Sequence, residues 1–208
     1  MSDRTAIRNS PLKLFQPMNI IVFLSFYSPI IVATSITSLS FIFQNFKGLI
    51  YLGFLLACCV VRSYIYMASG GTPVVDDNTI CTSVQYSQYG NPTFSSFVFS
   101  FTIMYLSLPM FSRGAPNYWV FSSLITYFLV DMFLKLYKGC IVSYGDLLLN
   151  VLLGTAFDAA FITAMYAGGS GKYLLFNEVA SNREICTQPK TQTFKCNLYK
   201  NGELVGNI

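Results

Sequence analysis

The chain has 208 residues, of which 53% are hydrophobic and only 11% are charged, and it contains no histidine. So little polar surface excludes a water-soluble globular protein, and the mean hydropathy of +0.52 predicts an integral membrane protein. The absence of histidine excludes catalysis by a histidine base or nucleophile and most zinc sites. The net charge of +4 is scattered along the chain, which fits anionic lipid head groups and not a nucleic-acid groove.

The first third of the chain contains a polar arm and two predicted membrane spans. Residues 1–17 are polar and form a short N-terminal arm. Residues 18–43 carry no charge over more than the roughly 20 residues that cross a bilayer, so they predict a first span, kinked at Pro29. Residues 49–67 predict a second span. Arg62, near its end, is expected either to extend to the interface or to point into the bundle.

The rest of the chain contains three more predicted spans and a polar tail. Residues 68–93 form the longest internal loop. Further apolar segments predict spans at 94–111, 118–134 and 146–167. In the polar tail 168–208, Asn201-Gly202 lies between two short apolar runs, which is typical of a type I′ β-hairpin. The predicted fold class is therefore all-α, a bundle of five transmembrane helices at residues 18–167 with a small tail.

Five spans place the two ends of the chain on opposite sides of the membrane. Outside the tail, the N-terminal side collects more cations, namely Arg4, Arg8, Lys13, Arg62, Lys135 and Lys138 against Lys47 and Arg113. The positive-inside rule then favours a cytoplasmic N-terminus, although the cations of the tail weaken this asymmetry. A tail in the lumen or exterior would allow Cys186 and Cys196 to form a disulfide. The six cysteines match no metal-binding spacing, and we expect neither a metal nor a cofactor.

The segment from Tyr89 to Phe101 has the pattern of a membrane helix that begins directly after a polar, turn-forming stretch. Pro92 suits the first helical turn because it lacks the N–H that would be unpaired there. Thr93 and Ser95 offer side-chain oxygens to the other free N–H groups. Further along the chain, Tyr144-Gly145-Asp146 precedes another apolar run, and Asp146 heads the fifth predicted span.

These two segments resemble the second and third signatures of the type 2 phosphatidic acid phosphatases, the PAP2 lipid phosphatases. The second signature has Pro-Ser-Gly-His at the mouth of a membrane helix. The third has an Arg, a Tyr-x-Gly, a His, and an Asp that leads a helix. Arg62 lies where the Lys of the first signature would fall, but Ser69-Gly70 replaces the Arg-Pro that should follow. The resemblance implies a site that faces the lumen or exterior, which conflicts with the charge count.

Both catalytic histidines of that family are missing from this chain. Ser95 occupies the place of the acid, and Ile141 or Val142 occupies the place of the nucleophile. Asp146 carries over cleanly, and Lys135 could replace a phosphate-binding Arg. Without a nucleophile the phospho-histidine mechanism cannot run, so the resemblance implies a scaffold that has lost catalysis.

A simpler interpretation of the same residues stays open beside the resemblance. Pro92 and Thr93 are ordinary residues for the start of a helix, and the Asp146 carboxylate is favourable against a helix dipole. Such caps are common, so either segment alone would favour this interpretation. Two matches in the expected order make the two interpretations about equal.

Asp131 and Asp158 lie inside predicted spans, where an unpaired carboxylate is costly and functional roles are frequent. They suggest a proton relay. Asp131 precedes Lys135 by one helical turn near the membrane edge, so an ordinary ion pair is favoured for it. For Asp158, a protonated carboxyl bonded to a hydroxyl of a neighbouring helix is favoured over transport.

The sequence predicts a multi-pass membrane protein that is not an enzyme and that anchors partner proteins to a bilayer. Its composition, rich in aromatic residues and without histidine, is also similar to that of uncharacterised membrane proteins of large DNA viruses. That similarity implies a virion internal membrane, or the host endoplasmic reticulum, and attachment to a capsid layer. The expected contact surfaces are loop 68–93 and tail 172–208. The alternatives are a PAP2-type lipid phosphatase with altered catalytic residues and a small transporter or channel subunit.

Overall fold

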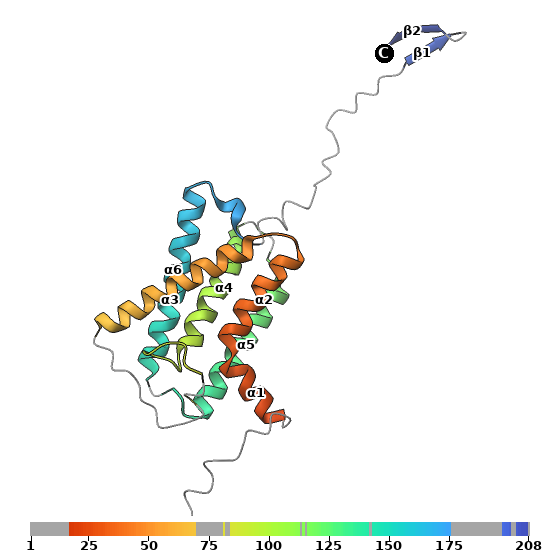
Figure 1. Cartoon of the computed structure of the whole chain (residues 1–208). Coiled ribbons are helices and arrows are strands. Elements are labelled where there is room, and N and C mark those ends of the chain that lie inside the picture. Colours follow the sequence, from red (N-terminus) through yellow and green to blue (C-terminus); the bar gives the residue numbers. More distant parts are fainter. Residues whose placement is uncertain are drawn as a thin grey trace, which may run out of the picture.

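Six α-helices dominate the part of the chain that the structure, a computed structural model, describes (Figure 1). The described residues are 17–69, 81, 84–112, 114, 116–141, 143–175, 197–200 and 203–207. The helices are α1 (Pro17–Phe26), α2 (Ser28–Ile42), α3 (Lys47–Ala68), α4 (Phe94–Ser112), α5 (Tyr118–Tyr137) and α6 (Tyr144–Ala167). They are followed by a short 3-10 helix, η1 (Gly171–Tyr173), and by the strands β1 (Asn197–Lys200) and β2 (Glu203–Asn207).

The helices confirm an all-α integral membrane protein with several spans. Each of α3, α4, α5 and α6 is long and apolar enough to cross a membrane, and these four helices match the later predicted spans closely. The prediction that the first span is one helix, kinked at Pro29, was wrong. Residues 18–43 form α1 and α2, which are bent by 74° at a break at Tyr27, and together they make a fifth candidate span. Pro29 lies in the first turn of α2, where its missing N–H needs no partner.

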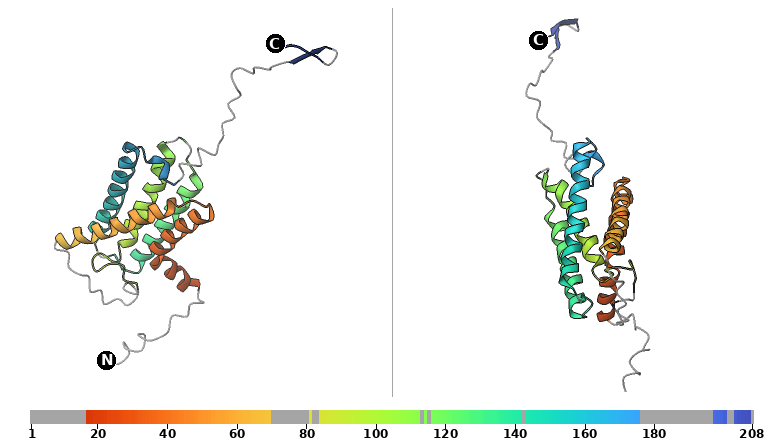
Figure 2. Two further views of the ribbon diagram at one scale, coloured as in Figure 1. Left: turned by 45° about the horizontal axis from the view of Figure 1, so that its top comes forward. Right: turned by 90° about the vertical axis from the view of Figure 1, so that its left-hand side faces the viewer.

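Helix α4 is the centre of the bundle. It packs most extensively on α6 and also contacts α2, α3 and α5, and most of its side chains are buried. Figure 2 shows α1, α2 and α3 on one side of α4, α5 and α6, and α3 runs obliquely across α4 and α6. Aromatic side chains fill the centre. Tyr51 of α3 packs against Phe101 and Tyr105 of α4.

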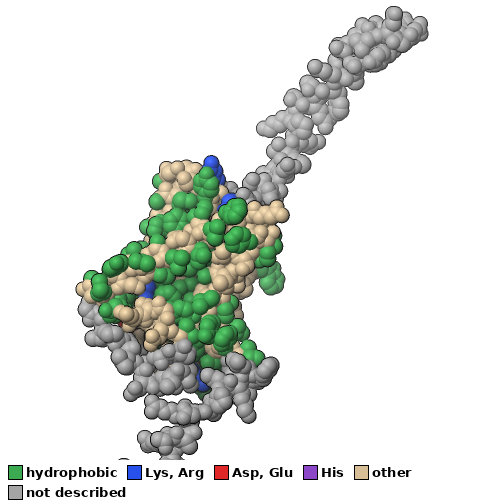
Figure 3. Space-filling view, in the orientation of Figure 1, with side chains coloured by type: hydrophobic (Ala, Val, Ile, Leu, Met, Phe, Trp, Pro, Cys, Tyr) green, Lys and Arg blue, Asp and Glu red, His purple; other side chains and the backbone are tan. Residues whose placement is uncertain are grey.

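The outside of the bundle is apolar, as a bilayer requires. Large side chains such as Trp119, Phe133 and Leu56 are exposed. On the face seen in Figure 3, hydrophobic side chains cover most of the described surface over α2 and α3. An exterior of this kind would aggregate in water but matches lipid tails, and helices satisfy all of their own backbone groups there.

A close contact between two helices lies at Gly154, where α6 meets α4. A Cβ atom at Gly154 would lie 2.6 Å from the carbonyl oxygen of Phe97 and 3.1 Å from the amide nitrogen of Phe101. Small residues at such crossings let helix backbones approach closely in a membrane. Gly53 of α3 is different, because a Cβ atom there would meet nothing within 4 Å.

We expect the Gly154→Ala variant to lower the free energy of unfolding by about 1–3 kcal/mol, because the α4 backbone has to move. The matched control is Gly53→Ala, which should be neutral or should stabilise α3 by up to about 1 kcal/mol through its better helix propensity. Thermal unfolding of the full chain in one detergent measures both variants. Equal melting temperatures for the two variants would contradict the packing at Gly154.

A small hairpin follows the bundle in sequence. Strands β1 and β2 are antiparallel, and Lys200 pairs with Glu203. This confirms the predicted hairpin, although Asn201 and Gly202 themselves lie outside the described residues. Cys186 and Cys196, the predicted disulfide of the tail, also lie outside them.

Candidate functional site

Polar residues gather at one end of the bundle, where α4 and α6 begin and α5 ends (Figure 1). Two buried groups of side chains lie there. The Asp131 cluster consists of Ser25, Ser28, Ser95, Asp131 and Lys135. The Arg62 cluster consists of Arg62, Tyr66, Thr93, Asn150 and the carbonyl groups of Tyr89 and Gly90.

In the Asp131 cluster, one carboxylate accepts four hydrogen bonds. Its Oδ1 accepts from the hydroxyls of Ser25 at 2.7 Å and Ser28 at 3.1 Å. Its Oδ2 accepts from the hydroxyl of Ser95 at 2.6 Å and from Lys135 Nζ at 3.1 Å. Lys135 Nζ also donates to Ser95 Oγ. Asp131 and Lys135 are 0% and 3% exposed, so this is a fully desolvated ion pair whose polar atoms are satisfied.

The break between α1 and α2 helps to build this cluster. Ser25 and Ser28 flank the break at Tyr27, and both hydroxyls point to Asp131. The predicted pair of Asp131 and Lys135 is therefore confirmed, but it lies inside the bundle and not at an exposed membrane edge.

In the Arg62 cluster, a buried guanidinium holds the chain that leads into α4. Arg62 Nε donates to Asn150 Oδ1 at 2.6 Å, and Nη2 donates to the carbonyl oxygen of Gly90 at 3.0 Å. Nη1 reaches the carbonyl oxygen of Tyr89 at 3.4 Å. The guanidinium also lies within 5.7 Å of three ring centroids, those of Tyr66, Phe94 and Phe97. Within the described residues no carboxylate forms a salt bridge with Arg62.

Asn150 connects this cluster to α6. Its Nδ2 lies within donating distance of the Tyr66 hydroxyl at 2.7 Å and of Thr93 Oγ1 at 2.8 Å. It also reaches the carbonyl oxygen of Asp146 at 2.7 Å. The sequence interpretation did not include Asn150. The sequence feature that could have identified it is an amide side chain inside an apolar run, one helical turn after Asp146. Such a group needs buried hydrogen-bond partners in a membrane.

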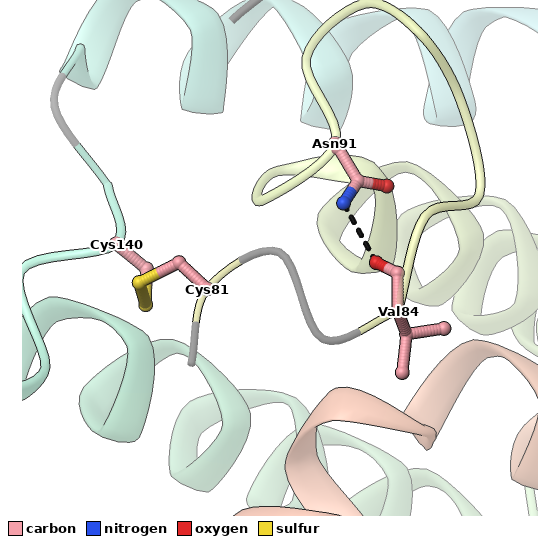
Figure 4. Close-up of a disulfide and its surroundings, with 4 residues drawn as sticks. All are labelled: Cys81, Val84, Asn91 and Cys140. Atoms are coloured by element: carbon pink, nitrogen blue, oxygen red, sulfur yellow. Dashed lines mark hydrogen bonds between the residues drawn. A yellow bond between two sulfur atoms is a disulfide. The ribbon is translucent and has the colours of Figure 1, made fainter. Parts of the chain in front are cut away.

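A folded loop covers this end of α4. Asn91 Oδ1 accepts from the amide of Tyr86 at 2.7 Å, and Asn91 Nδ2 donates to the carbonyl oxygen of Val84 at 2.7 Å (Figure 4). The ring of Tyr86 stacks on Phe94, and its hydroxyl donates to the carbonyl oxygen of Phe26 at 2.9 Å. Burial raises the pKa of the Tyr86 hydroxyl to about 12, so it remains a donor at neutral pH.

A disulfide between Cys81 and Cys140 ties this loop to the segment between α5 and α6 (Figure 4). Both cysteines pack against Phe26, whose ring faces Lys135 Nζ at 5.8 Å. The amide of Cys140 donates to the carbonyl oxygen of Lys135 at 2.9 Å. The covalent link therefore lies directly over the Asp131 cluster. No pattern in the sequence indicated a bond between these two cysteines, which are 59 residues apart.

Comparisons with protein-family models, curated proteins and solved structures found no match to this chain. No group of three His, Cys, Asp or Glu side chains in the described part of the chain could hold a metal ion.

The residues of the PAP2-like pattern separate into different environments. Ser95 and Lys135 lie in the Asp131 cluster, whereas Arg62 and Thr93 lie in the Arg62 cluster. The other positions do not complete a site. Pro92 lies in a turn before α4 and not in its first helical turn, and Asp146 is exposed in the first turn of α6. Ile141 is buried, and Val142 lies outside the described residues. For Asp146, this placement fits the simpler interpretation of a carboxylate at a helix N-terminus.

The disulfide also bears on orientation. Disulfides persist in oxidising compartments, so the end of the bundle with Cys81 and Cys140 is expected to face the lumen or exterior. This agrees with the sidedness that the resemblance implies and not with the charge count. The charge count still favours the opposite orientation when the buried Arg62 and Lys135 are left out, so the orientation stays a prediction.

Gly90 is the residue that brings the loop against Arg62. Its φ is +56°, and a Cβ atom there would lie 2.9 Å from Arg62 Nη2. We expect Gly90→Ala to lower the free energy of unfolding by about 2–3 kcal/mol, from backbone strain and from the crowded guanidinium. The matched control is Gly139→Ala, which shares a positive φ but has open space, and should lose only about 1 kcal/mol. Denaturant titration of both variants checks this, and equal losses would contradict the contact with Arg62.

Proposed function

We propose that this chain is a structural membrane anchor, which holds a braced loop surface at one face of a bilayer for a partner protein, and that it is not an enzyme. One observation carries the proposal: every charged side chain of the two clusters is bonded to other groups inside the bundle. The residues that could have acted on a substrate instead hold the loop and the helices together.

The Asp131 cluster lacks an activated nucleophile. A serine beside a lysine becomes nucleophilic only if the amine is neutral and can accept the hydroxyl proton. Here the Lys135 ammonium is paired with a carboxylate at 3.1 Å, and Ser95 donates its proton to that same carboxylate. Both side chains are also buried, so a substrate has no direct access to Ser95 Oγ.

The loop has the properties of a contact surface. The hydrogen bonds of Asn91, the stacking of Tyr86 and the disulfide fix its backbone. Gln85 and Gln88 are exposed on it. A surface that is rigid before binding loses little entropy when a partner docks. In the finer form of the proposal, loop 68–93 and tail 172–208 contact other proteins of an assembly, such as the capsid layer around a virion internal membrane.

Purification from native membranes in a mild detergent, after chemical cross-linking, tests this proposal. We expect a stoichiometric partner with cross-links to residues 84–93. The Gln88→Arg variant should reduce the yield of the partner several-fold, whereas Gln44→Arg, an exposed glutamine in the turn between α2 and α3, should not. Purification of the chain alone, with or without cross-linking, would argue against the anchor function.

A PAP2-type phosphatase with altered residues is the second candidate, and one observation favours it. Arg62 forms no salt bridge with a described carboxylate, and α4 and α6 both begin at the end of the bundle where its guanidinium lies. Helix N-termini and a cation together attract phosphate groups. This candidate predicts that phosphate or vanadate protects Lys135 and Asp146 from chemical modification. The transporter alternative is weaker, because the Asp131 carboxylate is already neutralised by Lys135.

A further inference from the structure

One buried acidic side chain takes no part in either cluster. Asp158 lies on the face of α6 that also carries Asn150, Gly154 and Ile162, and all four residues are buried. This face packs against α4, where Gly154 allows the backbones to approach. Asp158 is 0% exposed, two helical turns from Asn150 and away from the disulfide end of the bundle.

Neither carboxyl oxygen of Asp158 has a hydrogen-bond partner within the described residues. The sequence predicted a hydroxyl partner from a neighbouring helix, and the structure contradicts this. The groups that interact electrostatically with Asp158 are Tyr51 and Cys58 of α3 and Tyr105 of α4. None of these three groups is a cation. The Tyr105 side chain is itself buried, and its hydroxyl forms no hydrogen bond with Asp158.

The two intramembrane aspartates therefore differ in kind. Asp131 accepts four hydrogen bonds, one of them from an ammonium group. Asp158 accepts none within the described residues, and two of the buried cations, Arg62 and Lys135, are bonded elsewhere. An ionised carboxylate without partners in a low-dielectric core is costly by several kcal/mol, whereas the neutral acid carries a much smaller penalty.

We propose that Asp158 is a proton-binding site in the core of the bundle, and that the packing of α6 against α3 and α4 depends on the bound proton. An aspartate of the unfolded chain is ionised at neutral pH. The folded chain therefore binds one more proton than the unfolded chain at this position. By linkage, the free energy of unfolding falls as the pH rises from about 4, where the aspartate of the unfolded chain loses its proton, and the fall ends at the pH where the folded chain loses this proton as well.

Thermal unfolding of the full chain in detergent at a series of pH values tests this inference. The Asp158→Asn variant keeps the shape of the neutral acid but cannot ionise. We expect the melting temperature of the wild type to fall more steeply than that of Asp158→Asn as the pH rises from about 5, so that the difference between them changes with pH. Other groups that titrate in this range are common to both proteins. A difference that is independent of pH would overturn the proposal.

Infrared spectroscopy of the wild type supplies a second readout that does not require the variant to fold. A carbonyl band of a protonated carboxylic acid should be present at neutral pH and should shift when aspartate is labelled with carbon-13. Asp131→Asn is the matched control and should leave the band in place, because the Asp131 carboxylate is ion-paired. Absence of the band in the wild type, or its loss in Asp131→Asn, would overturn the assignment of the proton to Asp158.

Discussion

Replacing Lys135 with methionine should lower the free energy of unfolding by about 3–5 kcal/mol. The variant keeps most of the length of the side chain but removes the ammonium, so the Asp131 carboxylate stays buried with only the hydroxyls of Ser25, Ser28 and Ser95. A carboxylate at 0% exposure has no water to replace the lost cation. Unfolding by a denaturing detergent, followed by circular dichroism, measures the change.

The double variant Asp131→Leu/Lys135→Met is the control for this prediction. It removes both charges together, and paired removal of a buried ion pair is often nearly neutral for stability. We expect it to be more stable than Lys135→Met alone, although three serine hydroxyls lose their acceptor. Equal stability of Lys135→Met and the wild type would contradict a buried ion pair between Asp131 and Lys135.

Loss of the disulfide should have a comparable effect. The Cys81→Ser/Cys140→Ser variant is expected to lose about 2–5 kcal/mol, because the link closes a long segment of the chain in the unfolded state. The loop should also become more mobile over the Asp131 cluster. The melting temperature in detergent, with and without a reducing agent, measures the effect.

The control for the disulfide is the Cys59→Ser variant, since Cys59 is a free cysteine. It should keep both the stability of the wild type and its sensitivity to reductant, whereas the double variant should no longer respond to reductant. A wild type whose melting temperature is unchanged by reductant would contradict the role of the bond between Cys81 and Cys140.

Features that depend on local pattern could be predicted from the sequence. Hydrophobic runs of sufficient length gave α3, α4, α5 and α6, because a bilayer demands continuous apolar helices. The pair of Asp131 and Lys135 followed from helical spacing. The hairpin strands followed from the turn preference of Asn-Gly.

Features that depend on tertiary contacts could not be predicted in this way. Nothing in the apolar segment that contains Tyr27 indicates a break there. Only the hydrogen bonds of Ser25 and Ser28 to Asp131 show what the break does. The disulfide joins two loops that are separated in the sequence by α4 and α5, so it depends on how these two helices pack. The orientation could not be predicted from charge alone, because a count of cations does not distinguish a buried Arg62 from an interfacial one.

The central claim is that the two clusters hold the fold and do not catalyse a reaction. Its most direct test is phosphate release by the purified full chain from phosphatidate and isoprenyl-diphosphate substrates in mixed micelles. We expect no release above the background of a matched mock preparation, and the same result for Asp146→Ala. Release of phosphate by the wild type that is abolished in Asp146→Ala would contradict the claim.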